Sequence, residues 1–323
     1  MDIFNLTLRQ TTMMFLFILV GYFLRKAKIL PESSDLTMSR LETYVFVPSL
    51  TLSNMLNNCT VETFTQNSGL VLYSLITILF AIGLAYPLSR LFVPKTNGNP
   101  DLEYSRNIYK YAMTFGNYGF MGNFIVLGVW GEVFFFKYSL LTLVVGLFCS
   151  SWGLYILIPK DKNSASIWKN LAKGFLAPPM IALVVGIMAG LLGVRPYVPD
   201  FVMTALSNAA SCMGPVAMIL AGFVIAGYDF KSLLTNKKVY AATALRLIVI
   251  PSVMMTIMKL LGISDEIMTL VLIAFATPLG LNTIVYPSAY GGETRTGASM
   301  AMISHTLSVI TIPIMYLLFI VLW

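Results

Sequence analysis

The chain has 323 residues, of which 57% are hydrophobic and only 11% are charged. Soluble domains carry roughly 25% charged residues, so this composition excludes an ordinary water-facing surface. The formal net charge of +7 fits Lys and Arg gathered in the cytoplasmic loops of a membrane protein, and it does not indicate a nucleic-acid partner.

Apolar stretches long enough to cross a bilayer, about 20 residues each, follow one another along the whole sequence. Polar or charged clusters separate them and define ten predicted spans. These cover residues 6–24, 38–57, 68–93, 105–130, 133–158, 171–193, 198–227, 237–261, 266–290 and 295–322. The predicted fold class is an all-α polytopic membrane protein, with the lipid bilayer as its surroundings.

Lys and Arg concentrate in the loops that follow odd-numbered spans. These basic residues are Arg25, Lys26, Lys28, Lys95, Arg106, Lys160, Lys162, Lys169, Lys231, Lys237 and Lys238. Loops after even-numbered spans hold far fewer. Because positive loops stay in the cytoplasm, both termini are expected on the extracytoplasmic side of the plasma (inner) membrane.

The basic loop around residues 160–169 divides the chain into two predicted repeats, 1–160 and 161–323. Each repeat holds five spans. Because five is odd, the second repeat enters the membrane from the opposite side. Such inverted repeats are the architecture of many secondary transporters.

Glycine spacing relates the fourth span to the ninth. The interval from Gly119 to Gly131 and Glu132 equals the interval from Gly280 to Gly292 and Glu293. The offset is close to half the chain, which supports an internal repeat with a broken helix in each half.

Both segments are poor continuous helix, since glycines cluster in the fourth span and Pro278 removes a backbone donor in the ninth. Irregular backbone at membrane depth persists where it is buried in protein or lines a watery cavity. Half-helix N-termini and asparagine amides then suit an anion. The alternative is that these residues only permit close helix packing and a kink. The predicted substrate-binding residues are Gly116, Asn117, Gly119, Pro278, Gly280, Asn282 and Arg246.

Two further polar residues lie deep in the spans. Arg246 costs at least about 2.5–3.5 kcal/mol at such a depth, so it must face protein or water. It either attracts an anionic substrate or caps the carbonyls of a broken helix. His305, the only histidine, is a candidate proton relay, with a structural buried histidine as the alternative.

Carboxylates are scarce inside the predicted spans, so the coupling ion is left open between H⁺ and Na⁺. A sodium site made of carbonyls and hydroxyls would need no carboxylate. The three cysteines, Cys59, Cys149 and Cys212, form no CxxC pair. The sequence therefore predicts no metal site, no disulfide framework and no cofactor.

Three segments resemble the auxin efflux carrier family. Phe115–Gly122 (FGNYGFMG) resembles the family's FGNxGFxG-type segment, and Ala276–Asn282 (ATPLGLN) resembles its second broken-helix segment. Val45–Leu50 (VFVPSL) resembles its proline-containing second helix. The resemblance implies the fold shared with bile acid:sodium symporter-like carriers, in which ten helices include two broken ones, the fourth and ninth, that cross at the substrate site.

The resemblance also implies a division of labour. Helices 1, 2, 6 and 7 would form a scaffold, and helices 3–5 and 8–10 a transport part that moves as an elevator, often within a homodimer. The short central loop is typical of compact prokaryotic-type members, which are linked to organic acids such as malate or malonate. Auxin itself is not expected as the substrate.

The predicted function is therefore secondary active transport of a small organic anion. A non-transporting receptor or sensor built on a carrier fold is the alternative. An intramembrane enzyme is disfavoured, because the sequence has no HExxH motif, no paired aspartates and a single histidine.

Overall fold

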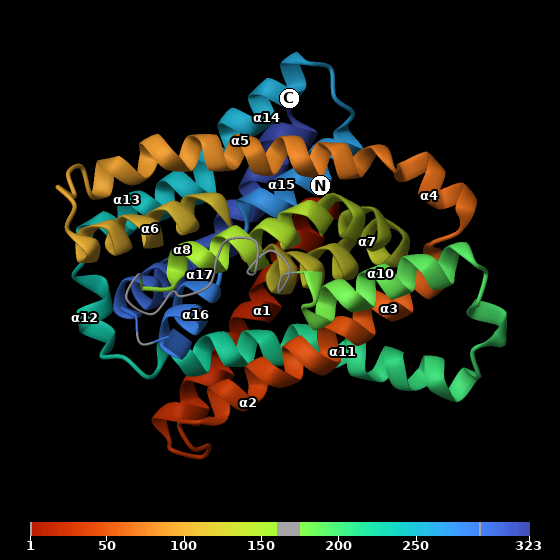
Figure 1. Cartoon of the computed structure of the whole chain (residues 1–323), viewed down its shortest axis with the longest axis horizontal. Helices are drawn as coiled ribbons and strands as arrows, with labels where there is room; N and C mark the ends of the chain where they lie inside the picture. The colour runs from red at the N-terminus through yellow and green to blue at the C-terminus, as the bar shows by residue number, and fades with distance from the viewer. Residues whose placement is uncertain (1, 160–174, 291) are drawn as a thin grey trace.

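The computed structural model describes residues 2–159, 175–290 and 292–323. Helices build this part of the chain, and it contains no β-strand (Figure 1). The elements before the central loop are α1 (Asp2–Lys26), α2 (Ser34–Leu41), η1 (Glu42–Phe46), α3 (Val47–Asn58), α4 (Val61–Asn67), α5 (Gly69–Phe92), α6 (Pro100–Thr114), η2 (Tyr118–Gly122), α7 (Asn123–Phe148), η3 (Cys149–Gly153) and α8 (Leu154–Leu157).

The elements after the central loop begin at Pro178. They are α10 (Pro178–Leu191), η5 (Arg195–Tyr197), α11 (Asp200–Ile225), α12 (Phe230–Leu234), α13 (Lys237–Ala244), η6 (Leu245–Val249), α14 (Ile250–Leu260), α15 (Asp265–Ala276), α16 (Asn282–Tyr290), α17 (Arg295–Tyr316) and η7 (Leu317–Val321). The first part of the predicted span 171–193 lies outside the described residues.

Within the described residues, six helical segments are long and apolar enough to cross a membrane. They are Ile3–Lys26, Val61–Phe92, Tyr118–Leu157, Asp200–Ile225, Lys237–Leu260 and Arg295–Val321. This confirms an all-α polytopic membrane protein. The count of ten spans and the inverted repeat stay predictions.

The predicted fourth and fifth spans share one long helical segment, Tyr118–Leu157. The chain nevertheless turns between them, because Gly131 in α7 has φ 78° and ψ −171°, which is not helical. Only glycine adopts such a backbone without strain. The predicted boundary between residues 130 and 133 is therefore a glycine kink.

Two π-helical turns precede prolines. In η1 the N–H of Val47 donates to the main-chain carbonyl of Glu42, and the next residue, Pro48, has no N–H to continue the series of helical hydrogen bonds. In η6 the N–H of Ile250 donates to the carbonyl of Leu245, just before Pro251. A π-bulge widens a helix by one residue and is frequent at functional sites. The turn η6 is the one that carries Arg246.

Glycines set the closest helix contacts. A Cβ added to Gly21 of α1 or Gly222 of α11 would collide with the main chain of the other helix. Gly186 and Gly190, the GxxxG pair of α10, pack in the same way on Met55 and Cys59 at the end of α3. The GxxxG pair thus serves packing within one chain, and the predicted homodimer draws no support from it.

The predicted breaks in the fourth and ninth spans are confirmed. Helix α6 ends at Thr114 and η2 begins at Tyr118, while α15 ends at Ala276 and α16 begins at Asn282. In Figure 1, α5 runs along one side of the molecule and α2, α3 and α11 run along the other. The broken helices lie between these two sides.

Candidate functional site

The two breaks meet in the interior. Gly116 and Leu279 form an antiparallel bridge. The N–H of Asn117 donates to the carbonyl of Pro278 at 2.7 Å, and the N–H of Leu279 donates to Ser304 Oγ at 3.1 Å. Main-chain groups that the helices leave unpaired are satisfied across this crossing, as a membrane interior requires.

Glycine at position 116 makes the close approach achievable. An added Cβ would lie 2.6 Å from Thr277 Oγ1 and 2.8 Å from the Thr277 carbonyl oxygen. Gly280 faces Gly116 with slightly more room, since its Cβ would lie 3.3 Å from the Gly116 carbonyl oxygen. Gly119 has nothing within 4 Å of its Cβ position. Of the predicted site glycines, Gly116 is the one that the crossing demands.

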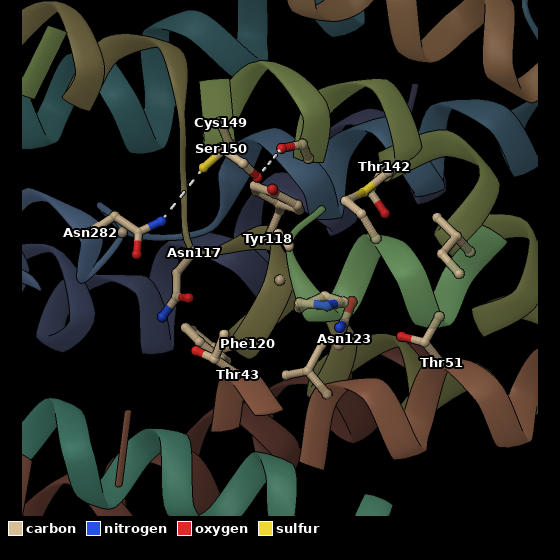
Figure 2. Close-up of a pocket in the computed structure, with 18 of the residues that line it drawn as sticks. Thr43, Thr51, Asn117, Tyr118, Phe120, Asn123, Thr142, Cys149, Ser150 and Asn282 are labelled. Atoms are coloured by element: carbon tan, nitrogen blue, oxygen red, sulfur yellow. Dashed lines mark hydrogen bonds between the residues drawn. The ribbon is translucent and has the colours of Figure 1, made fainter. Parts of the chain in front are cut away.

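A cavity of about 330 Å³ opens beside the crossing (Figure 2). The broken segments line it with main chain and amides, and η1, α3, α7 and α10 supply hydroxyls and apolar atoms. Five of the seven predicted site residues lie in its wall: Gly116, Asn117, Gly119, Gly280 and Asn282. No Asp, Glu, Lys or Arg occurs among the described lining residues.

The polar side chains of the cavity wall that sequence reasoning missed are the amide of Asn123, the thiol of Cys149 and several hydroxyls. The cavity wall includes Thr43, Thr51, Ser139, Thr142 and Ser150. Ser139 and Thr142 donate to carbonyls four residues earlier in α7, which is a common hydrogen bond for the hydroxyl groups of serine and threonine in helices. Nothing in the local sequence distinguishes these hydroxyls from others that face neighbouring helices.

The amide of Asn282 belongs to a cluster with Tyr111 and Cys149. Its Nδ2 lies 3.1 Å from Tyr111 Oη and 3.5 Å from Cys149 Sγ, and Tyr111 Oη lies 3.1 Å from Cys149 Sγ. A hydroxyl and a thiol can each donate or accept. The Asn282 amide can therefore turn over and keep hydrogen-bond partners in either orientation.

The amide of Asn117 has a different partner, His305. Asn117 Nδ2 lies 3.1 Å from His305 Nε2, and His305 Nδ1 lies 2.7 Å from the carbonyl oxygen of Ala301. Both side chains are buried, with exposed fractions of 3% and 1%. The structure thus brings the predicted proton relay directly against a predicted substrate ligand.

Arg246 lies behind the crossing and is not among the residues that line the cavity. Its fully buried guanidinium donates from Nη1 to the carbonyls of Met113 at 3.1 Å and Thr114 at 3.2 Å. These carbonyls belong to the last turn of α6 and have no helical partner. The guanidinium also lies over the ring of Phe275, 5.8 Å from its centroid. This geometry is that of a cap on a broken helix.

Pro278 contributes through its main chain, because its carbonyl accepts the hydrogen bond from Asn117. Its side chain does not line the cavity. Together with Arg246, Pro278 therefore supports the crossing, whereas the other predicted site residues face the cavity.

Comparison with known proteins finds similarity to membrane transporters. Residues 8–316 match the family model described as membrane transport protein. An uncharacterized transporter of Methanocaldococcus jannaschii is 25% identical over 301 residues, which cover 92% of this chain and 94% of that protein. The similarity spans both breaks and the crossing between them.

Proposed function

Because the family model matches nearly all of its length, this chain belongs to the membrane transport protein family, the auxin efflux carriers, and we propose that it is a secondary active transporter of a small organic anion. The family model is described as a membrane transport protein and the archaeal relative as an uncharacterized transporter, which supports a transporter. The observation that supports an anion is a polar cavity at the crossing of two broken helices, with no carboxylate among its described lining residues.

The size of the cavity favours a small substrate. Small-molecule sites range from about 300 to 1,000 Å³, and this cavity of about 330 Å³ is near the lower limit. A carboxylate or dicarboxylate of the size of malonate or malate fits that volume.

The chemistry of the wall favours an anion. No described lining residue carries a carboxylate that would repel it. The N-terminal turns of η2 and α16 carry the partial positive charge of a helix N-terminus, although the N–H groups of Thr283, Ile284 and Val285 in α16 already donate to the carbonyls of Gly280 and Leu281. Gly119 and Gly280 keep side chains away from these groups, and both residues line the cavity.

The lining also supports an elevator-type mechanism. Thr43, Thr51 and Met180 come from η1, α3 and α10, which belong to the proposed scaffold of predicted helices 1, 2, 6 and 7. Asn117 and Asn282 come from the proposed transport part. A substrate held by the two asparagines would move with the transport part past a wall of fixed scaffold residues.

Ligand-induced stabilisation tests the substrate class. We expect malonate or malate to raise the melting temperature of the purified protein, since a ligand that binds only the folded state stabilises it in proportion to the logarithm of its concentration above Kd. The screen includes monocarboxylates and amino acids, each with and without sodium. Stabilisation by amino acids alone would contradict the proposal that the substrate is a small organic anion.

Uptake into reconstituted vesicles tests transport itself. Loss of a hydrogen bond to a charged group costs about 1.5–3 kcal/mol, or at least tenfold in affinity. We therefore expect Asn117→Ala and Asn282→Ala to reduce uptake at low substrate concentration tenfold or more. Asn67→Ala, at the end of α4 and outside the cavity, is the matched control. Normal uptake by both site variants would contradict the site, and binding without any flux would favour a receptor.

The orientation of the chain in the membrane is a separate proposal. The basic loops predict extracytoplasmic termini. A reporter that is active only outside the cytoplasm, fused after Trp323, should therefore be active. If the reporter fused at that position lies in the cytoplasm, the orientation of the chain is the reverse of the predicted one.

A further inference from the structure

The ring of His305 is held in one tautomer. Its Nδ1 lies 2.7 Å from the carbonyl oxygen of Ala301, and a carbonyl can only accept. Nδ1 must therefore carry the hydrogen. In the neutral ring, Nε2 then has a lone pair and can only accept, so the group that faces it at 3.1 Å must be the Nδ2 donor of Asn117.

This hydrogen bond determines which atom of its amide Asn117 presents to the cavity. With its nitrogen committed to His305, the amide offers its oxygen to the space that Asn117 lines. Figure 2 shows the Asn117 oxygen on the side toward the other lining residues and the nitrogen turned away. An acceptor in that place opposes a carboxylate. Asn282 is not locked in this way, since Tyr111 and Cys149 can each donate or accept.

We propose that this carrier binds its anion together with a proton, and that His305 accepts the proton and reverses the Asn117 amide. This inference rests on the proposed transport of an organic anion. A hydronium ion transfers its proton, so that its O–H bond breaks, a new N–H bond forms at Nε2, and the ring becomes a cation while a water molecule leaves. Nε2 then donates to Asn117 Oδ1, and Asn117 Nδ2 turns into the cavity as a donor to the carboxylate.

Release of the anion reverses each step. The proton leaves Nε2 for water on the side where the anion leaves, Nε2 becomes an acceptor again, and the Asn117 nitrogen returns to it. No other bond forms or breaks. The Nδ1–H bond to Ala301 is present in both states, so the ring stays in place while its other face changes from acceptor to donor.

The surrounding charges make protonation conditional on the anion. Arg246 on η6 is the buried cation close to this site, with Nη2 2.5 Å from where a Cβ on Gly116 would be. His305 is hydrogen-bonded to Asn117, the residue after Gly116. A second cation on its ring is therefore unfavourable, because buried like charges repel strongly. An arriving carboxylate compensates for the second positive charge. The empty site therefore keeps a neutral His305, and the loaded site keeps a charged one.

Besides His305, α17 itself carries the titratable side chains of Arg295 and Tyr316. The charged side chains on elements packed against α17, besides Arg246, are Arg9, Arg25 and Lys26 on α1, Asp200 on α11, Lys231 on α12, Lys237 and Lys238 on α13, and Asp265 and Glu266 on α15, all exposed or half-buried. The uncharged titratable side chains on these elements are Tyr22 on α1, Cys212 on α11, Tyr240 on α13 and Tyr286 on α16. The His305 ring forms hydrogen bonds with Asn117 and Ala301.

The linkage between proton uptake and anion binding gives the direction in which affinity changes with pH. If binding of the anion takes up one proton, affinity rises as pH falls, by up to tenfold for each pH unit over which the free His305 is neutral. Calorimetric titration of the purified protein with malonate and with malate, at pH 7.0 to 8.5 and in buffers of different ionisation enthalpy, measures both Kd and the number of protons taken up. Both acids are dianions throughout this range.

The variants separate His305 from the rest of the site. We expect about one proton taken up by the wild type and none by His305→Gln, whose Kd should no longer depend on pH. Thr306→Ala, the exposed neighbour on α17, should keep the wild-type dependence. Undiminished proton uptake in His305→Gln overturns the assignment to His305.

Binding by the wild type without proton uptake overturns the inference even if His305→Gln does not fold, and it leaves the proposed anion transport intact. Failure of the wild type to bind any carboxylate at any pH would instead remove the proposed function, and this inference with it.

Discussion

A single methyl group at Gly116 should damage the crossing of the two broken helices. The Cβ of Gly116→Ala would lie 2.8 Å from the Thr277 carbonyl oxygen, whereas ordinary contact begins at 3.4 Å. The segments must therefore separate by about 0.6 Å. Such a shift stretches the 2.7 Å bond from the Asn117 N–H to the Pro278 carbonyl to the edge of hydrogen-bond distance.

The expected cost combines overpacking and the weakened bond. Added methyl groups in a close-packed interior cost about 1–3 kcal/mol, and a buried backbone hydrogen bond contributes about 0.5–1.5 kcal/mol. We expect Gly116→Ala to lower the melting temperature in detergent by several degrees and to reduce malonate uptake strongly, because the same shift moves Asn117.

Gly119→Ala is the matched control in the same segment. Its Cβ position has no atom within 4 Å and its φ is not positive, so its melting temperature should stay close to that of the wild type. Tryptophan fluorescence during heating and uptake by reconstituted vesicles are measured on both variants. Equal melting temperatures for Gly116→Ala and Gly119→Ala would refute the close contact at the crossing.

Three further changes test other parts of the structure. Arg246→Ala should lower the free energy of unfolding by about 1–3 kcal/mol, because two buried carbonyls lose their donor, and Arg246→Lys by less; an unchanged melting temperature of Arg246→Ala contradicts the capping role. In a variant whose other two cysteines are serine, malonate should slow modification of Cys149 by a small thiol reagent, since Cys149 lines the cavity; equal rates with and without malonate would place the anion elsewhere. Thr60→Ala removes the capping box of α4 and should cost about 1 kcal/mol, whereas melting of Thr65→Ala, an exposed threonine on the same helix, should change little.

The sequence indicates where the helices break because glycine and proline act locally. Gly116, Gly119 and Pro278 weaken a helix wherever they occur, and α6 and α15 do end beside them. Gly131 likewise marks a turn that hydropathy alone assigns to one long helix. The contact between the breaks is less local, and only the resemblance to carriers with crossing helices led to that expectation.

The partners of buried polar groups could not be read from the sequence. Its depth in an apolar span shows that Arg246 must face the interior, but not that it caps carbonyls of α6, more than 130 residues earlier. The hydrogen bond between Asn117 and His305 joins residues 188 positions apart. Such pairs depend on how the helices pack, and one sequence holds no local signal for packing of this kind.

At the crossing, some polar groups stabilise the broken helices and others face the cavity. This separation explains why the cavity is neutral. Arg246 is the buried cation of the region, yet its Nη1 donors serve the end of α6, so its charge acts on the cavity only at a distance. In the proposed function, recognition is then left to main-chain N–H groups, hydroxyls and the amides of Asn117, Asn123 and Asn282, and the polarity that an amide presents depends on its orientation. An amide that can reverse offers either a donor or an acceptor from one side chain, without carrying a charge through the membrane. A site of this kind can hold an anion in one state and release it in the next without any large movement of its own.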